Sequence, residues 1–173
     1  SIAEWYSARA QAEAERIVGW EQLESSILGG WLQRIAMRKA KLHGCAAGRN
    51  YIAISARGDI YPCHRFVGMR EWLLGNVKEG IVEEKKRQAF FDRTVDTMPK
   101  CQKCWVRYVC GGGCAYESVF YNSDLMVPYE ESCNLIRHTF QVALNLYISL
   151  YEKDDTLIAG LYQRLTTRGR TRE

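Results

Sequence analysis

The chain has 173 residues, 47% of them hydrophobic and 25% charged, which fits one globular domain or a domain plus a fragment. Lysine and arginine number 24 against 20 acidic residues, and the formal net charge of +4 assumes neutral cysteines. Because metal binding would deprotonate the seven cysteines, this small excess does not indicate nucleic-acid binding. The sequence has no apolar run long enough to span a membrane and no secretion signal. We therefore expect a cytoplasmic protein without membrane or nucleic-acid partners.

Residues 1–41 predict two helices joined near Gly19, because apolar residues recur there at helical spacing. The pair Gly29–Gly30 weakens the second helix and marks a break or a close contact with another element. Two helices without a sheet suggest the end of a preceding domain. We expect the chain to be the C-terminal part of a longer protein.

Residues 51–55 and 60–63 predict two short strands, and Arg57-Gly58-Asp59 between them has the composition of a turn. Cys45 precedes this hairpin and Cys63 lies in its return arm, so the hairpin is expected to bring both sulfurs to one end. Residues 73–77 predict a further strand and residues 82–94 a charged helix. Residues 97–133 show little periodicity, residues 134–151 predict a helix, and the basic segment 164–173 is expected to be mobile.

All seven cysteines belong to one spaced array: C-x12-G-x4-C, a gap, C-x2-C-x5-C-x3-C, a gap, and a last cysteine. An odd cysteine count with C-x2-C spacing and no secretion signal indicates metal binding in a reducing compartment rather than disulfides. Thiolates select zinc or iron-sulfur clusters. Three glycines, 111–113, separate two of the cysteines and would let backbone N–H groups approach a cluster closely.

Zinc is the main alternative to iron and sulfide. Two structural zinc sites need eight ligands, and the eighth would have to come from His43, His64 or His138. The paired C-x2-C arrangement that is usual in such sites occurs only once. Composition and spacing therefore favour iron-sulfur clusters while leaving zinc open.

The array resembles the SPASM domain, the auxiliary-cluster module at the C-terminus of many radical S-adenosylmethionine enzymes. The segments 58–68 (GDIYPCHRFVG), 75–77 (GNV) and 110–114 (CGGGC) are similar to the peptide-modifying branch, which includes thioether-forming (SCIFF-type) maturases and the maturation enzymes of quinohemoprotein amine dehydrogenase. The resemblance implies an α+β fold: a small cluster-organised domain with a short β-hairpin and flanking helices. It also implies three segments: 1–41 from the end of a partial (β/α) barrel, 42–134 as the SPASM domain, and 135–173 as a C-terminal helix and tail.

The resemblance further implies two [4Fe-4S] clusters. The cluster I cysteines would be Cys45, Cys63 and Cys114, which leave one iron open or held by a ligand other than cysteine, such as His43, an acidic side chain or water. The cluster II cysteines are expected to be Cys101, Cys104, Cys110 and Cys133. No C-x3-C-x2-C motif is present, so S-adenosylmethionine, its cluster and the catalytic residues are expected only in a core outside this sequence.

By the same resemblance, cluster I would bind or orient a precursor peptide and accept an electron after radical coupling, and cluster II would pass the electron to a carrier such as ferredoxin or flavodoxin. The expected product is a thioether or related cross-link. Two alternatives remain: a zinc-stabilised protein-binding module, and a plain iron-sulfur electron carrier. The pair His64-Arg65 beside Cys63 is a candidate to donate to a cluster sulfide or to position a peptide carboxylate, since arginine presents a rigid fork of donors. Five aromatic residues are candidates for shielding the clusters from water: Trp72, Trp105, Tyr108, Tyr116 and Tyr121.

Overall fold

The computed structural model describes residues 4, 5, 8, 9, 12, 28–38, 40–153, 156, 158–160 and 163. The chain divides into two compact units, residues 41–133 and residues 1–40 together with 134–173. Most of the first predicted helix, the joint at Gly19 and the basic segment 164–173 lie outside the described residues. No described helix is long and apolar enough to cross a membrane.

The discontinuous unit is built on helices α3 (Gly29–Met37) and α8 (Glu130–Lys153), of which α8 starts four residues earlier than predicted. α3 starts at the glycine pair, and residues 13–27 lie outside the described residues, so the predicted break stays a prediction. Arg38 ends α3 in the left-handed conformation. Apolar side chains spaced three or four residues apart on both helices form the core of this unit, together with Leu28 just before α3 and Ile158 after α8: Leu28, Leu32, Ala36, Ala143, Leu146, Leu150 and Ile158.

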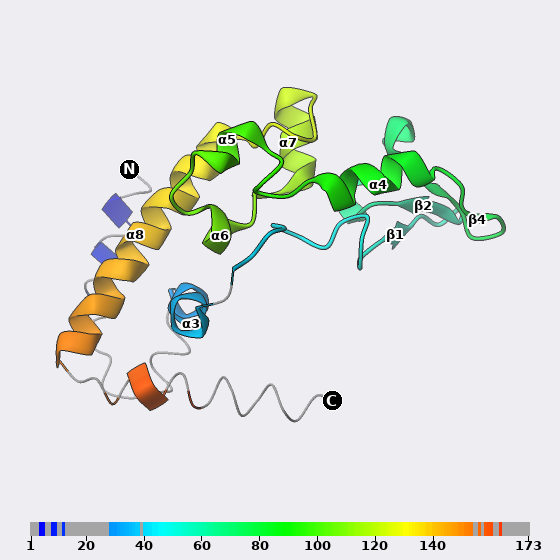
Figure 1. Cartoon of the computed structure of the whole chain (residues 1–173). Coiled ribbons are helices and arrows are strands. Elements are labelled where there is room, and N and C mark those ends of the chain that lie inside the picture. Colours follow the sequence, from blue (N-terminus) through cyan, green and yellow to red (C-terminus); the bar gives the residue numbers. More distant parts are fainter. Residues whose placement is uncertain are drawn as a thin grey trace. The chain divides into compact units, whose positions relative to one another are not determined.

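The continuous unit contains a four-stranded antiparallel sheet whose strands follow chain order (Figure 1): β1 (Ala53–Ile54), β2 (Asp59–Tyr61), β3 (Gly75–Asn76) and β4 (Gly80–Ile81). The predicted hairpin is confirmed, with Ala53 opposite Tyr61 and Ile54 opposite Ile60. Gly58 makes its turn at φ +85°, where an added Cβ would lie 2.8 Å from a methyl group of Val77. The sequence predicted β3 but not β4.

Six short helices complete this unit: η1 (His64–Phe66), η2 (Arg70–Trp72), α4 (Glu84–Asp92), α5 (Pro99–Gln102), α6 (Arg107–Cys110) and α7 (Ala115–Asn122). α4 confirms the charged helix predicted over 82–94. α7 was not predicted, because its buried positions are mostly small residues, Ala115, Ser118 and Val119. The α+β class is therefore confirmed.

Phe66 lies at the centre of the core of this unit and is fully buried. Its ring centroid lies 5.4 Å from Trp72, 5.8 Å from Phe90 and 5.5 Å from Tyr116, which are distances of favourable aromatic pairing. Cys63 is buried in the same cluster of side chains. The core thus fixes the segment that carries this cysteine.

Candidate metal centre

Cys45 and Cys63 lie at the ends of two segments that the backbone ties together. The Gly48 N–H donates to the Pro62 carbonyl at 2.8 Å and to the Tyr51 carbonyl at 3.0 Å, which holds the loop after Cys45 against the end of β2. Cys63 is buried, whereas Cys45 is exposed. One of these two thiols is therefore set in the core and the other is accessible.

Close backbone packing brings the segment before Cys45 against the three glycines before Cys114. A Cβ on Gly44 would lie 2.3 Å from the Gly113 carbonyl oxygen, and one on Gly111 would lie 2.5 Å from the His43 carbonyl oxygen. Neither position has room for a side chain. Gly111 also has φ +78°, a conformation that favours glycine. Because Gly44 and Gly111 have no side chains, two segments that are far apart in sequence can pack closely together. Each of these segments is followed directly by a cysteine.

The charges around Cys63 come from the same group of residues. Burial raises the pKa of the Cys63 thiol, the backbone N–H groups of Arg65 and Phe66 lower it, and the charges of Cys114 and Cys45 raise it. Hydrogen bonds from backbone N–H groups to a cysteine sulfur also suit a thiolate that ligates a metal. The charges of Cys45 and Cys114, the other two cysteines predicted for cluster I, thus act on Cys63.

Three of the predicted cluster II cysteines lie on and around α5 and α6. Cys101 is buried, and the pKa of its thiol is raised first by burial and then by the charge of Cys110, with a smaller contribution from Cys104. The Cys104 N–H donates to the Cys101 carbonyl at 2.9 Å in a tight turn. The fourth, Cys133, lies in the first turn of α8, and that turn is tied to α5 by an ion pair of 3.4 Å between Lys100 and Glu130.

Arg93 carries a buried positive charge, and only 4% of its surface is exposed. Its guanidinium donates to the carbonyls of Leu125 and Gly112, both at 2.7 Å, and to Ser118 Oγ at 2.9 Å. The sequence reasoning missed this residue, since nothing distinguishes it from the exposed charges of α4. Its bonds fix one of the three glycines that precede Cys114.

Burial lowers the pKa of the Arg93 guanidinium, and the negative charges of four cysteines oppose that effect. Two of them, Cys45 and Cys114, belong to the set predicted for cluster I, and the other two, Cys101 and Cys110, belong to the set predicted for cluster II. An arginine stays protonated even when buried. Arg93 therefore supplies positive charge to both groups.

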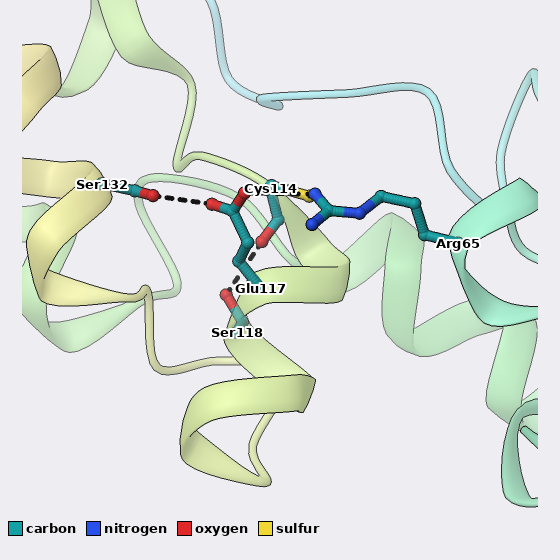
Figure 2. Close-up of polar contacts among 5 residues, drawn as sticks. All are labelled: Arg65, Cys114, Glu117, Ser118 and Ser132. Carbon is teal, nitrogen blue, oxygen red and sulfur yellow. Dashed lines mark hydrogen bonds and ion pairs between the residues drawn. The ribbon is translucent and has the colours of Figure 1, made fainter.

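Arg65 makes a direct contact with a predicted ligand. Its Nη1 donates to Cys114 Sγ at 3.2 Å and to Glu117 Oε1 at 3.1 Å (Figure 2). Cys114 is the residue immediately before α7. Partial burial lowers the pKa of Arg65, but the hydrogen bond to Glu117 and the charge of Cys114 outweigh it, so that pKa is raised. The predicted donor thus contacts a cysteine sulfur.

The three histidines occupy different surroundings. His43 Nδ1 donates to the Arg93 carbonyl at 3.1 Å, which leaves Nε2 with the lone pair that a metal ligand needs. Burial and the charge of Arg49 lower the pKa of His43, which favours the neutral ring. His64 Nδ1 lies 3.4 Å from the Tyr51 hydroxyl, and His138 lies on α8 in the discontinuous unit. His43 therefore has a hydrogen bond that suits a metal ligand.

The predicted aromatic shield is divided in the structure. Trp72 and Tyr116 pack against the core that contains Cys63. Trp105 and Tyr121 are more than half exposed, at 56% and 53%, and Tyr108 is 38% exposed. Only the first two are therefore placed to keep water from buried sulfur.

The donor set fits iron-sulfur clusters. The seven cysteines are thiols in the structure, and glycine backbones lie beside Cys114. Among the described residues, no group of three or more His, Cys, Asp or Glu side chains could hold a single metal ion. Thiolate ligands suit iron-sulfur clusters and also suit zinc.

Comparison with known proteins places the cysteines in a family context. The family model of SPASM, described as an iron-sulfur cluster-binding domain, matches residues 45–105, which include Cys45, Cys63, Cys101 and Cys104. An uncharacterized protein of Archaeoglobus fulgidus is 32% identical over 95 residues. That similarity covers 54% of this chain and 23% of the archaeal protein, so the chain spans about a quarter of that relative. The SPASM match supports iron-sulfur cluster binding in this part of the chain.

Proposed function

We propose that this chain is the auxiliary-cluster portion of a radical S-adenosylmethionine enzyme that modifies a ribosomally made peptide. The observation that carries the proposal is the seven-cysteine array, of which four members lie in the segment that matches the SPASM iron-sulfur domain. SPASM domains occur with radical S-adenosylmethionine enzymes, which supports an enzyme-associated role. The cleavage of S-adenosylmethionine, the precursor peptide and an electron carrier such as ferredoxin or flavodoxin belong to the proposal.

The division of the cysteines into two clusters is supported by their electrostatic environment. Cys63 feels the charges of Cys45 and Cys114, and Cys101 feels those of Cys104 and Cys110. Cys133 is assigned to cluster II by the resemblance and by the position of the first turn of α8. In this division cluster I has three cysteines and cluster II has four.

Cluster I is proposed to be the cluster next to the peptide. Its ligand Cys45 is exposed, and its three cysteines leave one iron for a substrate thiolate, a solvent molecule or another side chain. When bound, such a cluster supplies a Lewis-acidic iron and a one-electron acceptor. The chain itself supplies the buried anchor Cys63, the backbone N–H groups of Arg65 and Phe66 that lower the pKa of its thiol, and the charge of Arg93.

Paired cysteine substitutions test the division. In the intact enzyme, Cys45→Ala should remove about half of the auxiliary iron and abolish product formation, and Cys104→Ala should remove about the other half. The double variant should lose nearly all of it. If Cys45→Ala left the auxiliary iron and the product unchanged, the assignment of cluster I would be wrong.

A cysteine-containing peptide separates the proposal from a plain electron carrier. Binding of its thiolate to an open iron should change the absorption spectrum of the protein, and the matched peptide with serine in place of cysteine should not. A plain carrier would respond to neither peptide. A zinc-stabilised binding module would show no visible absorption before or after the addition.

A further inference from the structure

The contact between Arg65 and Cys114 belongs to a connected set of polar side chains. One carboxylate oxygen of Glu117 accepts a hydrogen bond of 3.1 Å from Arg65, and the other accepts a hydrogen bond of 2.7 Å from Ser132 Oγ (Figure 2). The guanidinium carbon of Arg65 also lies 4.3 Å from the ring centroid of Tyr116, within cation–π range. The guanidinium is thus fixed beside the sulfur by its bond to Cys114, its ion pair and an aromatic face.

Arg65 and Glu117 thus place two opposite charges near one predicted ligand, Cys114. The side chain of Arg65 is 39% exposed and that of Glu117 is 23% exposed, so water screens both charges only in part. A positive charge and an N–H···S hydrogen bond at a ligand sulfur stabilise the reduced, more negative form of a cluster. A carboxylate that offsets the positive charge has the opposite effect.

We propose that Arg65 and Glu117 act as an opposed pair that sets the reduction potential of cluster I, with Arg65 raising the potential and Glu117 limiting the rise. This inference rests on the proposed cluster bound through Cys45, Cys63 and Cys114. Both are positioning residues, since they act through the sulfur of Cys114. Reduction adds one electron from an external donor to the cluster, and neither side chain is oxidised or reduced.

A purely structural ion pair predicts a different outcome. If Arg65 and Glu117 only held η1 against α7, removing either partner would loosen the same contact, and both changes would affect the cluster in the same direction. An electrostatic role requires opposite shifts, because the two side chains carry opposite charges. The direction of each shift therefore separates the two roles.

The test is a redox titration, followed by electron paramagnetic resonance, of the anaerobically prepared protein with its clusters. Arg65→Gln should lower the midpoint potential of cluster I by about 59 mV. This shift corresponds to a tenfold change in the equilibrium constant of a one-electron reduction. Glu117→Gln should raise it, and Arg65→Lys, which keeps the charge without the planar fork, should fall between Arg65→Gln and the unchanged protein. Cluster II provides an internal reference and should shift less.

Lys86→Gln is the matched control, since Lys86 pairs with Glu83 at 3.6 Å on α4 and donates to the Leu73 carbonyl rather than to a cysteine. It should leave both potentials unchanged. Shifts of the same sign in Arg65→Gln and Glu117→Gln, or none, with iron content intact, would overturn the inference alone. If the Arg65→Gln protein did not hold cluster I, the potential of cluster I in Glu117→Gln would decide the test: a rise would support the inference, and no rise would overturn it. If the protein without any substitution contained no iron and sulfide, that result would overturn the proposed function as well.

Discussion

Replacing Arg93 with methionine tests whether one buried guanidinium holds the glycine segment next to the cysteines. Arg93 makes three short hydrogen bonds, to Leu125 and Gly112 at 2.7 Å and to Ser118 at 2.9 Å. Methionine has no donor, so three polar partners would lose their hydrogen bonds. At about 1.5 kcal/mol for each bond to a charged group, the free energy of unfolding should fall by about 4 to 5 kcal/mol.

Anaerobic urea denaturation, followed by tryptophan fluorescence, measures this loss. With an m value of about 1.5 kcal/mol/M, the midpoint should fall by about 3 M, a large part of the stability of a typical domain. Arg93→Lys is the companion variant, because it keeps the charge but cannot reach three acceptors with a planar fork, so its loss should be smaller. A midpoint within a few tenths of a molar of the unchanged protein for Arg93→Met would refute this account of the guanidinium.

Three further results are expected. Gly44→Ala should lower cluster content and stability, because its Cβ would lie 2.3 Å from the Gly113 carbonyl oxygen, and iron analysis with thermal melting measures both. Gly30→Ala, with no atom within 4 Å of its Cβ, should instead stabilise α3 by about 0.5 to 1 kcal/mol, which a melting curve detects. In the metal-free chain, burial raises the pKa of Cys63 and Cys101 above the ordinary 9.0. The folded state therefore holds these protons more tightly than the unfolded state does. The urea midpoint of the metal-free chain should decline as pH rises above about 9. A urea midpoint that stays constant or rises above that pH would contradict this prediction.

The sequence predicted the elements whose signals are local. The hairpin followed from alternating residues on both sides of Gly58, and α4 followed from a charged helical run. β4 has only two residues, Gly80 and Ile81, and shows no alternation. α7 is short, and its buried positions are mostly small, so its apolar face is weak.

Candidate ligands could be named from the sequence, whereas most of the residues that support them in the structure could not. The predicted hairpin placed Cys45 and Cys63 at one end, whereas the division of all seven cysteines into two sets came from the family resemblance. The roles of the supporting residues depend on contacts over long sequence separations: Arg93 binds carbonyls 19 and 32 residues away, and Arg65 reaches a sulfur 49 residues away. No motif marks such pairs, because packing brings them together.

The iron, sulfide and zinc content of the anaerobically prepared chain tests the central claim most directly. Two four-iron clusters predict about eight irons and eight sulfides per chain, a brown colour and little zinc. About two zinc ions per chain, no sulfide and no visible absorption would contradict cluster binding and identify a structural zinc module instead.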